Sequence, residues 1–153
     1  MQREPELGMI GSRSLVFAAA VSGFICVAIG AMGAHSLPKN LQKAGFSETV
    51  IAKKIEQCEI AVRYQMYHTL AILGLALSPA IRQRRAWRVS CVLFFLGILL
   101  FSGGLYSMVF FDRMGHWSIV PIGGTVLIIA WIAIAFSTLF PDKSDLGTGV
   151  SPA

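Results

Sequence analysis

The residues best suited to chemistry in this sequence lie close together, between positions 64 and 68. Tyr64, Gln65, Tyr67 and His68 occur there inside an otherwise apolar stretch. Helical spacing predicts one shared face for Ala61, Tyr64, Gln65, His68, Ala71 and Leu75. An imidazole, whose pKa is ordinarily about 6.5, can bind a metal or cofactor or sense pH. The same ring can instead hydrogen-bond between packed helices, and the sequence favours that structural interpretation.

The two other histidines, His35 and His116, suggest a further possibility. If consecutive helices run antiparallel, all three histidines fall in the same half of the protein, where methionines could complete a site for a soft, copper-like ion. No two histidines are four residues apart and no H-E-x-x-H motif occurs, so we predict no metal site. The candidate ligand-binding residues are His35, Tyr64, Gln65, Tyr67 and His68.

Catalytic signatures are missing from the sequence. We find no nucleophile elbow, phosphate-binding loop, dinucleotide fingerprint or kinase-like set of motifs. Cys26, Cys58 and Cys91 are odd in number and lack C-x-x-C spacing, so neither a disulfide framework nor a zinc site is indicated. We therefore predict no catalytic residue and no cofactor.

The composition points to the lipid bilayer as the solvent of this chain. Of its 153 residues, 55% are hydrophobic and 14% are charged, against about 45 to 50% and about 25% in soluble domains. The net charge of +5 does not indicate nucleic-acid binding, because the basic residues lie between apolar runs and not along one face.

Four apolar runs are long enough to cross a membrane. They cover residues 14–34, 64–81, 89–111 and 117–140, and a helix needs roughly 18 to 20 residues to span the hydrocarbon core. The backbone must bond internally in lipid, so these runs are predicted to be helices. The first run exceeds the core of a signal peptide and is kept as a spanning helix. The predicted fold is all-α, an integral membrane four-helix bundle in up-down-up-down order.

The segment between the first two runs predicts an amphipathic extension at the start of the second spanning helix. Pro38 can begin a short helical turn, Gly45 can end it, and Ser47 offers an N-cap for a long helix over 48–80. Apolar residues then recur with helical spacing at Ile51, Ile55, Cys58 and Val62, and the charged residues Glu48, Lys53, Lys54, Glu56, Glu59 and Arg63 take the other faces. The extension is expected at the lipid headgroups or beyond them, or as a solvated face without a partner.

Small residues predict where helices approach one another, because association in lipid depends on close backbone contact. The first run carries such residues on one stripe, and the third and fourth runs repeat them with heptad spacing. The predicted packing positions are Ala19, Gly23, Gly30, Gly33, Gly97, Gly104, Gly123 and Gly124.

The predicted domain organisation is a flexible N-terminus over 1–13, a four-helix membrane domain over 14–140 and a flexible tail over 141–153. Orientation follows from the rule that Lys and Arg in short loops stay in the cytoplasm. A cluster of arginines lies between the second and third runs, at Arg82, Arg84, Arg85 and Arg88. We therefore expect this connection and both termini on the cytoplasmic side.

Four motifs resemble those of a known family. They are G-A-M-G-A-H at 30–35, A-V-R-Y-Q-M-Y-H-T-L-A at 61–71, L-G-I-L-L-F-S-G-G-L-Y at 96–106 and P-I-G-G at 121–124, followed by Trp131. In this order, over residues 14–140, the chain resembles domain-of-unknown-function family 423, which includes the transmembrane protein 256 relatives of animal mitochondria. Departures from the residues usual in the family occur at Ser36, Gly104 and Ala130. The resemblance implies a four-helix inner-membrane protein without an established activity.

The sequence thus predicts a multi-pass protein of the cell inner (plasma) membrane that is a structural or accessory subunit of a membrane assembly. The alternative is a binding or transport module for a small ligand, proton or metal at the end that carries His35 and His68. The expected partners are the lipid bilayer and other membrane subunits or further copies of this chain, and no nucleic acid.

Overall fold

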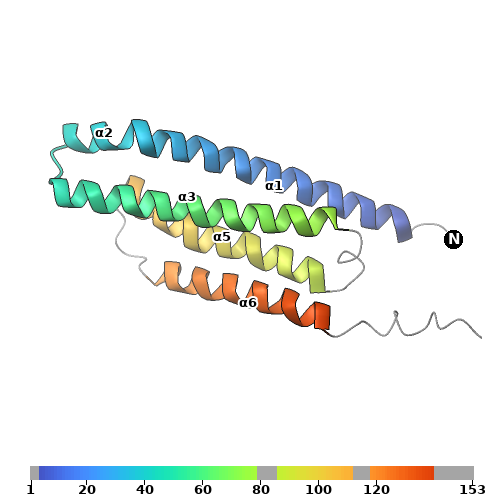
Figure 1. The fold of residues 1–153 in the computed structure, drawn as a ribbon. Coiled ribbons are helices and arrows are strands. Elements are labelled where there is room, and N and C mark those ends of the chain that lie inside the picture. The colour runs from blue at the N-terminus through green and yellow to red at the C-terminus, as the bar shows by residue number, and fades with distance from the viewer. Residues whose placement is uncertain (1–3, 79–85, 112–117, 140–153) are drawn as a thin grey trace, which may run out of the picture.

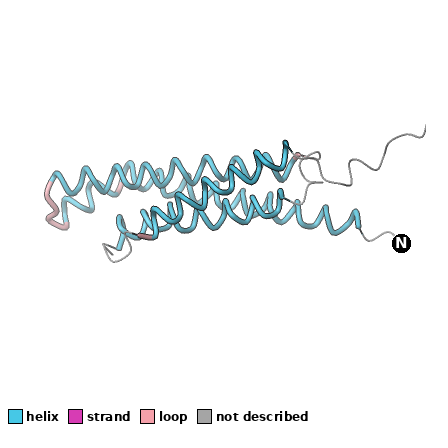
Figure 2. Tube along the Cα trace, turned by 90° about the horizontal axis from the view of Figure 1, so that it is seen from below, coloured by secondary structure: helices cyan, strands magenta, loops and turns pink. Residues whose placement is uncertain are grey.

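The computed structural model describes residues 4–78, 86–111 and 118–139, with side chains over 12–78, 87–111 and 118–136. Within these ranges the chain is helical, with short turns and no β-strand (Figures 1 and 2). The helices are α1 (Glu4–His35), α2 (Leu37–Lys43), α3 (Glu48–Leu77), α5 (Ala86–Phe111) and α6 (Ile119–Leu139).

The connection between α1 and α3 follows the predicted turn signals. Pro38 lies in the first turn of α2, where its missing N–H costs nothing. Gly45 adopts a φ of 80° just after α2, a left-handed conformation that glycine adopts without strain. Ser47 has extended backbone and is the N-cap of α3, but its hydroxyl bonds to Thr49 and not to the helix backbone.

Among the residues that the structure describes, three helices contain segments long and apolar enough to cross a membrane. The segments are Ser12–His35 in α1, Trp87–Phe111 in α5 and Ile119–Phe136 in α6, close to three of the predicted runs. In the described part of the second predicted run, 64–78, no segment qualifies by the same measure. Charged residues occupy the first half of α3, and α3 ends at Leu77 instead of residue 80; 79–81 lie outside the described residues.

The long helices form an elongated row in which each runs opposite to the one before it (Figure 1). Helix α1 packs on α3, α3 on α5, and α5 on α6. Helices α1 and α6 lie on opposite sides of this row and share no extensive interface within the described residues. The arrangement is therefore more open than a closed ring of four helices.

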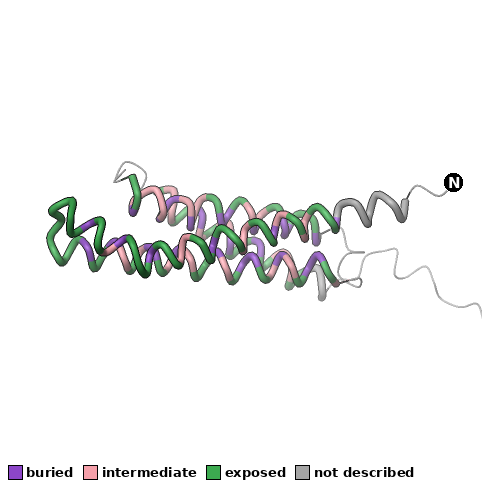
Figure 3. The backbone as a smooth tube through the Cα atoms, turned by 90° about the horizontal axis from the view of Figure 1, so that it is seen from above, coloured by how far each residue is buried: buried purple, intermediate pink, exposed green. Residues whose placement is uncertain are grey.

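Two apolar clusters hold the row together. The larger, which we call the central core, joins α1, α3, α5 and α6 through Ala19, Ile72, Leu75, Trp87, Cys91, Phe94, Ile98, Leu127 and Ala130. The smaller, which we call the end cluster, joins α2, the start of α3 and the end of α5 through Leu37, Leu41, Ile51, Cys58 and Val109. Most residues of α2 and of the connection to α3, at the left of Figure 3, are exposed.

Candidate functional site

Gln65 is the centre of a hydrogen-bond network between α1, α3 and α5. Its side chain is buried, and its Nε2 donates to the carbonyl oxygen of Ser22 at 3.0 Å and to the Ser22 hydroxyl at 3.3 Å. The Tyr106 hydroxyl donates to Gln65 Oε1 at 2.8 Å. Ser22 also bonds to the Thr69 hydroxyl at 2.7 Å. Both ends of the amide are satisfied within the chain, so Gln65 connects three helices and has the bonding of a structural residue.

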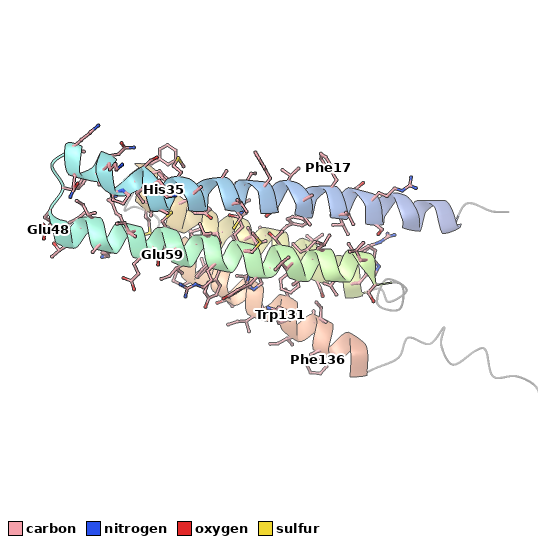
Figure 4. All side chains as sticks on the ribbon, turned by 45° about the horizontal axis from the view of Figure 1, so that its top comes forward. Phe17, His35, Glu48, Glu59, Trp131 and Phe136 are labelled. Atoms are coloured by element: carbon pink, nitrogen blue, oxygen red, sulfur yellow. The ribbon has the colours of Figure 1, made fainter. Side chains whose placement is uncertain are left out.

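His68 lies on a different face of α3, among aromatic rings. Its ring centroid is 5.4 Å from that of Phe94, 6.0 Å from that of Tyr64 and 6.2 Å from that of Trp131. The side chain is only 6% exposed. Figure 4 shows Trp131 on α6, beside α3. The histidine thus occupies a mainly aromatic site built by α3, α5 and α6.

The hydrogen bonding of His68 leaves one ring nitrogen open. Its Nδ1 lies 2.7 Å from the carbonyl oxygen of Tyr64, and because a carbonyl only accepts, Nδ1 carries the proton. In the neutral ring Nε2 is then an acceptor, and it has no hydrogen-bond partner among the described residues. No group of three or more His, Cys, Asp or Glu residues able to hold a metal occurs in that part of the chain. The arrangement therefore suits a hydrogen-bond donor better than a metal ion.

The structure brings together some of the predicted ligand-binding residues and separates others. Tyr64 and His68 stack, and Tyr67 is exposed. The prediction that Gln65 shares their face is wrong, because Gln65 bonds to Ser22 of α1 and Tyr106 of α5. His35 is exposed at the end of α1, about 20 Å along that helix from Ser22, the partner of Gln65. His35 and His68 therefore do not form one site, and His116 lies outside the described residues.

Lys54 is buried. The prediction that it lies on the charged outer faces of the extension is therefore wrong. Its side chain is 6% exposed, and Nζ donates to the carbonyl oxygens of Met108 at 3.0 Å and Val109 at 3.2 Å. The last carbonyls of a helix lack partners within it, and a cation near them is favourable. The Phe46 ring, with its centroid 5.5 Å from Nζ, adds a cation–π contact. The sequence contains one indication of this burial. Ile51, Lys54 and Cys58 have helical spacing, which places the lysine on the apolar stripe of the helix.

Glycines of α1 lie against α3. A Cβ atom added at Gly33 would come within 2.9 Å of Cys58 Sγ, and one at Gly30 would touch Val62 at 3.4 Å. A Cβ at Gly23 would make ordinary contact with Thr69 at 3.8 Å, and Ala19 is buried in the central core. The contact between α1 and α3 is thus tightest near the end of α1.

Glycines also line the contact between α5 and α6. A Cβ at Gly97 would collide with the Leu127 side chain, and one at Gly104 would lie 2.9 Å from Val120. At Gly123 it would overlap the backbone of Phe101, whereas at Gly124 it would lie 3.7 Å from the ring of that residue. Gly123 is therefore a position of direct backbone approach between the two helices.

The chain is similar to proteins that have been named but not characterised. Residues 29–124 match the family model described as "Protein of unknown function (DUF423)". A UPF0382 membrane protein of Haemophilus influenzae is 42% identical over 82% of this chain and 92% of its own length. The UPF0382 inner membrane protein YgdD of Escherichia coli K12 is 39% identical over 78% of this chain and 85% of its own length. A UPF0382 membrane protein of Staphylococcus saprophyticus is 33% identical over 78% and 91% of the two chains. No solved structure matches.

Proposed function

The chain belongs to the DUF423 family of proteins of unknown function, and from that premise we propose that it is a four-span inner-membrane protein. In this proposal it acts without catalysis, as a structural or accessory subunit of a membrane assembly. The arginine-rich connection after α3 and both termini face the cytoplasm.

The register of α3 on α1 supports a fourth span. Near one end of the α1 candidate span, the Ser12 hydroxyl donates to the carbonyl oxygen of Ala76 at 2.7 Å. Near the other end, Gly33 lies against Cys58. The part of α3 from Cys58 to Ala76 is about 27 Å long at 1.5 Å per residue, close to the roughly 30 Å of the hydrocarbon core. A membrane crossed by α1 would therefore also be crossed by this part of α3.

The charged residues of α3 are compatible with that placement. Glu59 and Arg63 are exposed and lie near the Gly33 end of the segment. Long cationic side chains at such a position extend towards the headgroups while their stems stay in lipid. Lys54 then lies beyond the hydrocarbon core, at the end cluster.

The main support for a subunit role is that the helices form an open row, which leaves one side of α1 and one side of α6 uncovered within the described residues. Helices α1 and α6 are each covered mainly on one side, and large apolar side chains project from both, with Phe17 and Phe24 of α1 more than 70% exposed. Such faces can receive lipid or the helices of neighbouring subunits. The Gln65 network, by contrast, uses its polar groups inside the chain, as a structural element does.

The subunit role is tested by purifying the tagged protein at native expression level in mild detergent, followed by native gels and mass spectrometry. We expect a defined partner in fixed ratio. Ala28→Trp, on the exposed face of α1, should remove that partner, whereas Leu99→Trp, on an exposed position of α5, should retain it. A lone, monodisperse protein of one chain would contradict the proposal.

We infer a second candidate function, a binding or transport module for a small ligand, proton or metal, and the open Nε2 of His68 favours a ligand that donates a hydrogen bond, or a proton, over a metal. The separation of His35 from His68 makes His68 the residue to test. If this function operates, small-molecule or metal content measured on the purified protein should fall in His68→Phe and persist in His35→Phe. Equal content in both variants, with the fold intact, would count against it.

A further inference from the structure

A cleft of about 290 Å³ lies between the end of α1 and the first half of α3. Its floor includes the buried residues Gly33 and Cys58, and its mouth includes Ala34, Glu59 and Arg63, all three exposed. Figure 4 shows Glu59 on α3, near the end of α1 that carries His35. The cleft therefore combines an apolar floor with a charged rim.

The cleft lies at the level where the α1 candidate span ends, since Gly33 and Ala34 lie within two residues of its last residue, His35. With α1 across the bilayer, this is the depth of the lipid headgroups. A cleft at this depth is open to phospholipids from the side and to their headgroups from above.

The two rim charges are arranged as a complementary pair that does not close on itself. Glu59 and Arg63 are one helical turn apart, and their Cβ atoms are therefore about 5 to 6 Å apart. That spacing favours an ion pair between the two residues. In the described part of the chain, however, neither Glu59 nor Arg63 forms an ion pair with the other or with any further residue. Each charge is left free for an external partner.

We propose that this cleft binds a zwitterionic phospholipid with a primary ammonium headgroup. The guanidinium of Arg63 takes the phosphate, for which its planar fork of donors is suited. The carboxylate of Glu59 takes the ammonium at the level of Gly33, and the start of an acyl chain continues past Gly30, further into the span. A choline headgroup offers Glu59 no N–H donor, and an anionic glycerol headgroup offers it no positive charge.

The test uses the full-length protein in detergent, incubated separately with dioleoyl phosphatidylethanolamine, phosphatidylcholine and phosphatidylglycerol, with bound lipid counted by native mass spectrometry. We expect phosphatidylethanolamine to be retained about tenfold more strongly than phosphatidylcholine, the difference of about one charged hydrogen bond. Arg63→Gln should reduce retention of all three lipids. Glu59→Gln should bring phosphatidylethanolamine to the level of phosphatidylcholine.

Two further variants separate specific binding from the lipid that coats any membrane protein. Lys53→Gln and Glu56→Gln remove exposed charges from the same helix outside the cleft, and they should leave the preference unchanged. Ala34→Phe fills the mouth without altering charge and should lower retention of all three lipids. Equal retention of the three lipids by the natural chain would overturn the proposal, as would a preference that survives Glu59→Gln. The result does not depend on a partner subunit, because the lone protein is measured.

Discussion

At the scale of single residues, Lys54 shows how a buried charge is tolerated in this protein. Among its contacts, two main-chain carbonyls near the end of α5 accept hydrogen bonds from the ammonium group, and one aromatic ring lies beside it. The lysine thereby fastens the start of α3 to the end of α5, at the end cluster. Removing only the charge leaves those carbonyls without this donor, and a buried acceptor left in that way costs about 1 to 3 kcal/mol.

We expect Lys54→Met to lower the free energy of unfolding by about that amount, measured by thermal or denaturant unfolding in detergent. Lys53→Met is the matched control, because Lys53 is the neighbouring lysine and is exposed. It should change stability by no more than about 0.5 kcal/mol. Equal effects of the two substitutions would show that the Lys54 bonds contribute nothing to the fold.

At the scale of elements, the pairing of α5 with α6 depends on where the two backbones meet. A Cβ at Gly123 would lie 2.8 Å from the carbonyl carbon of Leu100, and a backbone cannot yield as a flexible side chain can. The next residue, Gly124, faces only the Phe101 ring at ordinary contact distance. The two adjacent glycines thus differ: a side chain at position 123 would collide with backbone, whereas one at position 124 fits at ordinary contact distance.

Gly123→Ala should therefore force α6 away from α5 and destabilise the protein by about 1 to 3 kcal/mol, the usual cost of overpacking. Gly124→Ala should be neutral or stabilising, because alanine is favoured over glycine in a helix by up to about 1 kcal/mol. Melting temperatures of the two variants in one detergent distinguish the cases. A larger loss at Gly124 than at Gly123 would contradict the observed register of the two helices.

At the scale of the whole molecule, the number of spans decides the topology. With α3 as a fourth span, Asn40 and Gln83 lie on opposite sides of the membrane and the C-terminus lies on the side of Gln83. If only α1, α5 and α6 crossed, Asn40, Gln83 and the C-terminus would all lie on one side. The two topologies are therefore distinguishable by chemical labelling.

We expect a single cysteine at Asn40 to react with a membrane-impermeant maleimide in intact cells, in a background lacking Cys26, Cys58 and Cys91. Cysteines introduced at Gln83 and at Ser151 should react only after the membrane is permeabilised, since both positions should face the cytoplasm. Labelling of Gln83 in intact cells together with Asn40 would rule out the fourth span.

What the sequence determined by itself follows from local physics. Apolar runs long enough to cross a bilayer predicted the helical class and four spanning helices, of which three contain candidate spans among the described residues. Pro38, Gly45 and Ser47 predicted where α2 begins and ends and where α3 begins. The predicted end of α3, at residue 80, lies beyond the observed end at Leu77. These features depend on the chain within a few residues, so periodicity and turn chemistry are sufficient to find them. The resemblance to a family, based on four motifs in order, was also contained in the sequence.

Only the tertiary structure decided which residues meet. It separated His35 from His68, turned Gln65 towards α1 and α5, placed His68 among the rings of α5 and α6, and buried Lys54 against the end of α5. Each of these contacts depends on the register and rotation of one helix against another. Register is set by the packing of side chains far apart in the chain, such as Gly33 against Cys58 and Ser12 against Ala76. Residue types and their spacing along one helix do not contain that information.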